Sequence, residues 1–348
     1  MAQAKKTKAG TWTILVYSHT ETIDGKEKRI YERFTADKKS EVVRMAEDFK
    51  ANRKGQTTIL TVEQALQNYI DMKRNILSPA TLRGYINIHK NRFPTIRNIP
   101  INKLTNKEIQ AEVNIEATRY APKTLRNTYG VLSTILAVYA PYFQLRITYP
   151  ANAAEETVIP TEQEIKLLLD HCKSFQLSLA MKIAFGMGLR RSEICALKAS
   201  DIDFCKNQIK VQRAMVKTPE KKWILKTPKT KAGKRTLSIP DFLIPDLKQA
   251  VQVKEPNDLI FSLNPENVSN RYMRLVAKIG INHITFHALR HYHASMMLAN
   301  NVPSKYAMKR MGHESDMMLK RVYQHTMENK EKEVTQTINT YLSNAFLQ

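Results

Sequence analysis

The sequence predicts a multidomain α+β protein, and three observations support this fold class. Its 348 residues are too many for one ordinary hydrophobic core. Residues 1–55 contain stretches with the composition of strands, whereas residues 61–145 carry apolar side chains at helical spacing. After residue 157, helical patterns flank a second strand-like stretch. We therefore expect a small module of β-sheet and helix, a helical bundle, and a mainly helical domain with a small antiparallel sheet.

The first module is expected to span residues 1–55. Residues 11–17 and 28–34 are rich in β-branched and aromatic side chains, and an Asp-Gly dipeptide between them is a turn signal. A helical pattern follows over residues 40–52. These features predict a small sheet packed against one helix.

The second domain is expected to span residues 56–148 and to be entirely helical. Thr61 and Thr105 are each followed three residues later by Gln or Glu, which is the spacing of a capping box at a helix start. Pro79 and Pro122 stand where proline commonly opens a helix. Four helix starts within this length suit a compact bundle.

The third domain is expected over residues 157–335. A linker is expected at residues 146–160, which contain Pro150 and Pro160 with small residues between them. The pattern of the third domain is helical except at residues 208–239, where three stretches of strand-like composition predict three antiparallel strands. The final residues, 336–348, have the pattern of a short apolar helical tail.

The chain is strongly basic. It has 55 Lys+Arg against 32 Asp+Glu and a formal net charge of +23. Such an excess attracts polyanions, so nucleic acid is the partner that the composition favours. The alternative is a generally basic protein that has no such partner.

Nothing in the sequence suggests secretion, a membrane or a metal. The cysteines Cys172, Cys195 and Cys205 are too few for a disulfide framework, and no CxxC pair predicts a zinc site. The N-terminus lacks the apolar region of a secretion signal, and no apolar run approaches membrane-spanning length. We therefore expect a cytoplasmic protein with reduced thiols.

Arginines and histidines in the third domain suggest a phosphate-binding site. Gly188 is expected to end one helix, so that Arg190 projects at the start of the next. His287 and Arg290 lie three residues apart and would share one helix face. Arginine suits a phosphodiester because its planar fork grips two oxygens and keeps its charge. We select Arg190 and Arg290 as phosphate ligands, although each motif taken alone is more often an ordinary surface or boundary feature.

A tyrosine follows these residues in the sequence. A phosphodiester under attack gains negative charge, which fixed donors stabilise by about 2–4 kcal/mol each. His313, next to Gly312, is a candidate hydrogen-bond donor or proton carrier. Tyr323 is the candidate nucleophile, because a phenol with a pKa near ~10 is also a good leaving group and keeps the covalent step reversible. Its position alone would not single out Tyr323 among 14 tyrosines.

Taken together, these motifs resemble the tyrosine recombinase (phage integrase) family. The matching segments are residues 187–203, 286–291 and 311–313 with Tyr323, and they match in order and spacing. The resemblance is strongest over residues 157–330, and the helical region before them resembles the family's core-type DNA-binding domain. It implies the tyrosine recombinase fold and a site-specific DNA recombinase that cleaves and rejoins strands through a 3′-phosphotyrosyl intermediate and a Holliday junction.

The resemblance also implies a catalytic role for each matching residue. Arg190 and Arg290 would bind the scissile phosphate, His287 and His313 would add hydrogen bonds, and Tyr323 would attack it. The attack leaves a phosphotyrosyl bond at the 3′ end and a free 5′-hydroxyl. In this scheme all the groups converge on one phosphate.

Other residues are expected to support this chemistry. Glu193, three residues after Arg190, would orient the phosphate-binding side chains without binding the phosphate itself. The family's catalytic lysine sits in a β-hairpin, where Lys229 matches it as the general acid for the leaving 5′-oxygen. Lys231 is the main competitor, because this segment is rich in lysine. His291 and His293 are expected to be structural or supporting residues.

The expected partners also follow from the resemblance. Four protomers would assemble on two double-stranded DNA sites, and an accessory DNA-bending protein is a possible further partner. Residues 1–55 resemble an arm-type DNA-binding module, and residues 336–348 would contact either a neighbouring protomer or their own domain. No cofactor is expected: the sequence has no P-loop and no clustered carboxylates, and a covalent phosphotyrosine conserves bond energy without ATP or metal.

Two other functions stay open at this point. A type IB topoisomerase shares the chemistry but acts alone, and the N-terminal module argues against it. A non-catalytic DNA-binding protein could keep the fold, but it would have no use for Tyr323. Residues 1–55 also favour the integrase of a prophage or integrative element over the chromosome-dimer resolvases, which usually begin with the helical domain.

Overall fold

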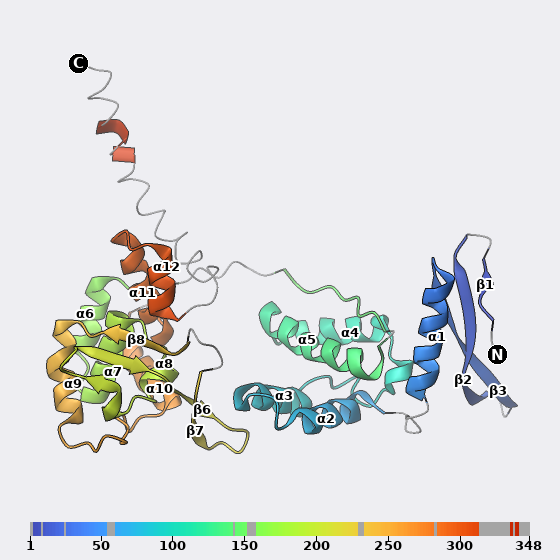
Figure 1. Cartoon of the computed structure of the whole chain (residues 1–348), viewed down its shortest axis with the longest axis horizontal. Coiled ribbons are helices and arrows are strands. Elements are labelled where there is room, and N and C mark those ends of the chain that lie inside the picture. Colours follow the sequence, from blue (N-terminus) through green and yellow to red (C-terminus); the bar gives the residue numbers. More distant parts are fainter. Residues whose placement is uncertain are drawn as a thin grey trace. The chain divides into compact units, whose positions relative to one another are not determined.

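The computed structural model describes most of the chain, and Figure 1 shows the elements in sequence colours. The described residues are 3–7, 10–23, 26–53, 60–141, 143–151, 158–228, 233–281, 284–312, 335–336 and 338–340. The chain divides into two compact units, Met1–Lys73 with Asn87–Ala151, and Arg74–Ile86 with Asn152–Gln348. Among the described helices, none is both long and apolar enough to cross a lipid bilayer.

The N-terminal module is a three-stranded antiparallel sheet with one helix. Its elements are β1 (Lys5–Lys6), β2 (Trp12–Ile23), β3 (Lys26–Ala36) and α1 (Lys39–Arg53), in the strand order β1-β2-β3. Its buried core consists of Ile14, Val16, Phe34, Val42 and Ala46. Alternate side chains of the two long strands can all meet the helix, because successive residues of a strand point to opposite faces. The predicted sheet and helix are present, with longer strands and an additional β1. The predicted Asp-Gly turn lies outside the described residues.

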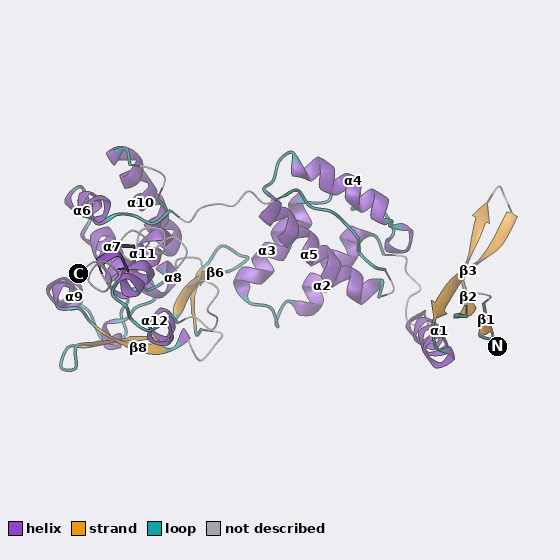
Figure 2. Cartoon of the chain, turned by 90° about the horizontal axis from the view of Figure 1, so that it is seen from above, coloured by secondary structure: helices purple, strands orange, loops and turns teal. Residues whose placement is uncertain are grey.

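Four α-helices lie in the described part of residues 60–151, and Figure 2 shows them as purple ribbons. They are α2 (Val62–Lys73), α3 (Pro79–Asn91), α4 (Asn106–Ala117) and α5 (Pro122–Tyr139). Each begins at the residue that the sequence predicts. Thr105 and Glu108 form the reciprocal capping box of α4, and Thr61 and Gln64 exchange the equivalent two bonds before α2. Prolines open α3 and α5.

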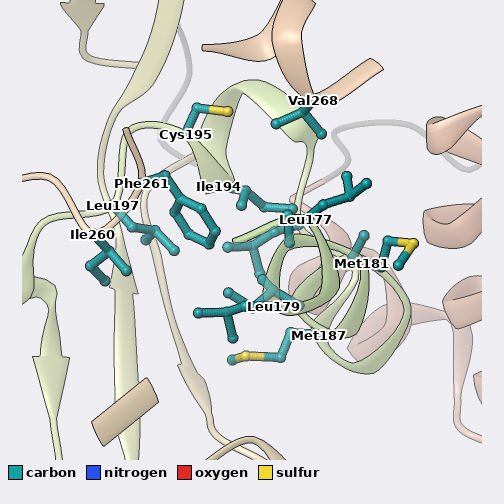
Figure 3. Close-up of a cluster of buried hydrophobic side chains, with 14 of the residues drawn as sticks. Leu177, Leu179, Met181, Met187, Ile194, Cys195, Leu197, Ile260, Phe261 and Val268 are labelled. Atoms are coloured by element: carbon teal, nitrogen blue, oxygen red, sulfur yellow. The ribbon is translucent and has the colours of Figure 1, made fainter. Parts of the chain in front are cut away.

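The third domain contains the remaining described helices and two small sheets. Its helices are α6 (Glu162–Asp170), α7 (Phe175–Met187), α8 (Arg191–Ile194), α9 (Ile244–Val251), α10 (Pro265–Ile279), α11 (Phe286–Ala299) and α12 (Ser304–Met311). Helix α7 contacts α8, α10 and α11. Figure 3 shows part of the resulting core, in which Leu177 and Met181 of α7 are buried in one cluster with Ile194, Phe261 and Val268. This packing holds the helix termini that carry the predicted site residues.

The strands of this domain differ from the prediction of three antiparallel strands. They are β4 (Ile202–Asp203), β5 (Gln208–Val211), β6 (Ala214–Lys217), β7 (Trp223–Lys226) and β8 (Arg235–Ser238). The three predicted strands correspond to β5, β7 and β8, whereas β4 and β6 are additional. The strands form two sheets, β4-β5-β8 and β6-β7, with a division between β5 and β6. The division falls at Gln212 and Arg213, whose side chains both bind the buried carboxylate of Asp201. Successive side chains of a regular strand point to opposite faces. Two neighbouring side chains that bind the same carboxylate break this alternation, so the strand ends there.

Candidate active site

A left-handed turn connects α7 to α8 and sets the direction of Arg190. Gly188 ends α7 with a φ of 70°, and Arg190 is the N-cap residue of α8. A Cβ atom at Gly188 would lie 2.6 Å from Cδ2 of His293 and 2.7 Å from Sδ of Met311. Glycine is therefore required at this position by conformation and by close packing, as the predicted helix end implies.

Glu193 fixes the side chain of Arg190. Nη1 of Arg190 donates to Oε1 of Glu193 at 2.9 Å, and the Arg190 backbone N–H donates to Oε2 at 2.8 Å. Nη2 of Arg190 donates to the carbonyl oxygen of Gly312 at 3.1 Å. The Arg190 side chain keeps 35% of its surface exposed, whereas that of Glu193 keeps 5%. The pair therefore presents an oriented guanidinium to solvent, while the supporting role of Glu193 in the reaction stays a prediction.

Arg290 lies in the same cluster but is buried. Its guanidinium donates to the carbonyl oxygens of Gly188 and Met311. Burial and the charge of Arg190 lower the pKa of Arg290 to about 9, so it remains a cation at neutral pH. The structure thus brings both predicted arginines to one place, and Arg290 also ties the α7–α8 turn to the end of α12.

His287 and His291 pack together on α11 near these arginines. Their rings meet edge to face, with centroids 4.7 Å apart. Partial burial, His291 and the neighbouring arginines lower the pKa of His287 to about 4. Because solvent still reaches the His287 side chain, screening weakens this shift, but a lowered pKa keeps the ring neutral at pH 7. A neutral imidazole can still donate one hydrogen bond to a phosphate oxygen.

Arg235 is a member of this cluster that the sequence reasoning did not select. Its Nη1 and Nη2 donate to Oε1 and Oε2 of Glu193 at 3.1 and 2.9 Å. Burial by itself raises the pKa of Glu193, but bonds and charges from Arg235 and Arg190 outweigh burial and hold this pKa below its usual value. Strand alternation in the sequence could have identified Arg235. It begins β8, and residues two apart in a strand point to the same face, so Arg235 points inward on the same face as the buried Leu237.

His293 links α7, α11 and α12, which agrees with the structural role expected for it. Its Nδ1 lies 2.8 Å from the carbonyl oxygen of Phe185, to which it donates as the protonated nitrogen, and Nε2 accepts from Nε of Arg310 at 3.3 Å. His293 is 1% exposed, and burial lowers its pKa to about 4. The ring is therefore a fixed, neutral part of the structure behind the Gly188 turn.

A basic cavity of about 1120 Å³ lies next to this cluster, between the β4-β5-β8 sheet and helices α11 and α12. Five of its lining residues are cationic, namely Lys210, Lys234, Arg235, Lys309 and Arg310, and no acidic residue lines it. Residues from α11 and α12, including Met297 and Tyr306, supply an apolar wall. In the described part of the chain, no group of three or more potential metal-ligating side chains is present.

Three predicted site residues, Lys229, His313 and Tyr323, lie outside the described residues, as does Lys231, the alternative to Lys229. Described residues flank the two segments that contain these four residues. Lys226 closes β7 before the lysine segment, Gly233 follows that segment, and Gly312 caps α12 immediately before His313. The roles of the four residues therefore stay predictions.

Family models match two parts of the chain. The model described as phage integrase family matches residues 160–330, and the model described as phage integrase, N-terminal SAM-like domain, matches residues 61–116. A relative named tyrosine recombinase XerC-like, from Caldanaerobacter subterraneus subsp. tengcongensis, is 29% identical over 301 residues. That match covers 76% of this chain and 75% of the relative.

Solved structures confirm the fold. The Tn1549 transposon integrase, solved in complex with a circular intermediate DNA, aligns with a TM-score of 0.67 and 18% identity, covering 79% of this chain and 99% of that one. The lambda integrase dimer bound to a COC′ core site aligns with a TM-score of 0.56 and 17% identity, covering 92% of this chain and 94% of that one. The chain therefore belongs to the phage integrase family and is a tyrosine recombinase, an enzyme of site-specific DNA recombination.

Proposed function

We propose that this recombinase acts on double-stranded DNA to integrate or excise a mobile genetic element such as a prophage. The observation that carries the proposal is the cluster of Arg190, Glu193 and Arg290. A carboxylate orients one partly exposed guanidinium, and a second guanidinium is buried behind it. Such fixed donors suit the negative charge that builds on a phosphodiester under attack, because they need no rearrangement during the reaction.

The proposed reaction is a transesterification at one phosphate. The phenol of Tyr323 gives its proton to solvent as its oxygen bonds to the phosphorus, and the bond from phosphorus to the 5′-oxygen breaks. Lys229 gives a proton to the departing 5′-oxygen, and Arg190 and Arg290 hold the non-bridging oxygens. His287 and His313 add hydrogen bonds to the same oxygens. The products are a 3′-phosphotyrosyl bond and a free 5′-hydroxyl, and the reverse step by a hydroxyl of the partner strand rejoins the DNA. No high-energy cofactor is needed, because the phosphotyrosyl bond keeps the energy of the broken phosphodiester.

The proposed assembly is a homotetramer on two synapsed DNA sites that exchanges strands through a Holliday junction. The net charge of +23 supports DNA as the partner. Residues 157–335 would act as the catalytic domain, residues 56–148 would bind core-type sites and residues 1–55 would bind arm-type sites. The tail at residues 336–348 would contact a neighbouring protomer, and an accessory DNA-bending protein would assist synapsis. The cytoplasm is the proposed location, because the substrate is cellular DNA.

The mobile-element role rests on the N-terminal module and on the relatives. The described strands β1–β3 and helix α1 form a folded module before the helical domain. The lambda and Tn1549 integrases, proteins of a phage and a transposon, share the fold over most of this chain. These two observations favour an integrase over an enzyme that resolves chromosome dimers.

The direct test is trapping of the covalent intermediate. DNA from the flanks of the gene is offered as a nicked duplex, so that the short 5′-hydroxyl strand diffuses away after cleavage. We expect wild-type protein to form a protease-sensitive protein–DNA adduct on a denaturing gel without ATP or added metal. Tyr323→Phe should bind the same DNA but form no adduct, because it lacks the attacking oxygen.

Other outcomes of this test would contradict the proposal. An adduct in both proteins would mean that a different residue attacks. Tight binding without an adduct in either protein would indicate a non-catalytic DNA-binding protein. Relaxation of supercoiled DNA without any exchange between paired sites would indicate a topoisomerase.

A further inference from the structure

Arg235 binds two parts of the chain besides Glu193. Its Nε donates to the carbonyl oxygen of Arg310 at 2.8 Å, and its Nη1 lies 3.5 Å from the carbonyl oxygen of Gly233. With the two bonds to Glu193, all three guanidinium nitrogens of Arg235 have partners. A single side chain of β8 thus joins α8, the end of α12 and the segment before β8.

Arg235 lines the basic cavity, but its side chain is almost fully buried, so it is placed to act on neighbouring residues. It keeps 4% of its surface exposed, against 35% for Arg190. Arg235 can influence a bound phosphate through Glu193, the carboxylate that it shares with Arg190. Fork-to-fork pairing with the carboxylate fixes both the position and the rotation of that carboxylate, which a single contact would not.

The two residues whose carbonyl oxygens Arg235 contacts are close in sequence to other predicted site residues. Gly233 directly follows the segment that holds Lys229 and Lys231, and Arg310 precedes His313 by three residues. The same side chain therefore contacts Gly233, directly after the first of these segments, and Arg310, three residues before His313.

We propose that Arg235 is a positioning residue for strand cleavage, which orients Arg190 through Glu193. The inference rests on the proposed function, since it concerns the same reaction. Small displacements of such groups are costly, because a misplacement of about 1 Å can lower a rate by about a hundredfold.

Because charged groups surround Glu193, the proposal predicts how the cleavage rate of an Arg235 variant depends on pH. The groups that face its carboxylate are Arg190 at the start of α8, Arg235 from β8 and Arg290 from α11. In an Arg235→Met variant the strongest of these attractions is removed while the burial remains, so the pKa of Glu193 rises. Glu193 then takes up a proton as the pH falls, and a protonated carboxyl no longer attracts Arg190.

The experiment measures the single-turnover cleavage of the nicked duplex at saturating full-length protein, from pH 8 to pH 5.5. We expect Arg235→Met to cleave about a hundredfold more slowly than wild type at pH 7, with DNA affinity within a few-fold. The deficit should widen as the pH falls. Arg235→Lys keeps one charged contact and should recover part of the rate. Glu193→Gln should be slow at every pH, and adding Arg235→Met to it should cost less than the product of the two single losses.

A matched control separates positioning from stability. Arg213 pairs with the buried carboxylate of Asp201 in the same domain, and neither residue contacts Glu193 in the described structure. Arg213→Met therefore removes a comparable ion pair and should leave the saturating cleavage rate and its pH profile unchanged. Thermal unfolding of each variant shows whether the domain has folded.

Several results would overturn the proposal. One is a wild-type saturating rate in Arg235→Met, or in Arg235→Lys if the methionine variant does not fold. Another is an equal loss in Arg213→Met, and a third is a deficit confined to DNA affinity. Failure of the proposed function itself is distinguishable, because wild-type protein would then form no adduct at any pH.

Discussion

At the residue scale, burial separates the roles of three arginines that surround one carboxylate. Arg190 is partly exposed and faces solvent, whereas Arg290 and Arg235 are buried and bind backbone carbonyls or Glu193. A buried cation is costly unless it is paired and hydrogen-bonded, so these contacts offset the cost of burying the two inner guanidiniums. The outer arginine is thereby oriented before any DNA arrives.

The choice between Lys229 and Lys231 as general acid also belongs to this scale. We expect Lys229→Ala to slow cleavage by about 10²–10⁴-fold, because the 5′-oxygen then leaves without a proton. A substrate with sulfur at the bridging 5′ position should restore the rate, since a thiolate leaves without protonation. Lys231→Ala serves as the matched control and should show a modest loss on both substrates.

The outcome is measured as the ratio of cleavage rates on the sulfur and oxygen substrates. A large ratio in Lys231→Ala instead of Lys229→Ala would make Lys231 the acid. Equal ratios in wild type and in both variants would mean that neither lysine donates the proton.

At the element scale, the α7–α8 turn depends on Gly188. Gly188 and Gly280 both end helices in the left-handed region, but a Cβ at Gly280 meets nothing within 4 Å. We expect Gly280→Ala to cost about 1–2 kcal/mol of conformational strain. Gly188→Ala should cost about 1–3 kcal/mol more, because its Cβ meets the His293 ring, which is held by two hydrogen bonds.

Urea unfolding can compare these two glycine variants. The chain has two tryptophans, Trp12 and Trp223, so a Trp12→Phe background leaves Trp223 to report on the third domain. Gly188→Ala should also slow cleavage, because Arg190 follows two residues later. Equal destabilisation by both substitutions would show that the ring contact at Gly188 carries no cost.

At the scale of the whole molecule, the N-terminal module should be separable from the chemistry. The module has its own buried core, formed by residues of β2, β3 and α1. We therefore expect a variant lacking residues 1–55 to cleave a nicked core-site duplex at a rate within a few-fold of wild type. It should lose the additional binding to longer DNA that carries flanking arm-type sites.

Mobility shifts on core-only and on extended DNA, at one fixed salt concentration, measure this separation. Salt must be held constant because phosphate contacts make affinity fall steeply as salt rises. Loss of cleavage on core-only DNA would assign the module to the catalytic fold. Unchanged binding to the extended DNA would mean that it recognises no arm-type site.

The sequence by itself determined most of the local structure and the family. Helix starts follow from capping boxes and prolines, which act within a few residues, so Thr61, Thr105 and Pro122 marked them correctly. The end of α7 at Gly188 was predictable for the same reason. The motifs around Arg190 and Arg290 were sufficient for the family, because their order and spacing are properties of the sequence itself.

Only the tertiary structure decided how the site is held. Arg235 meets Glu193 across 42 residues and Arg310 across 75, and no local pattern encodes a contact between such distant positions. The interruption between β5 and β6 likewise depends on Asp201, which draws two successive side chains toward one buried carboxylate. A buried charge must find its partners wherever the fold brings them, and for that reason the supporting network of the site emerged from packing rather than from periodicity.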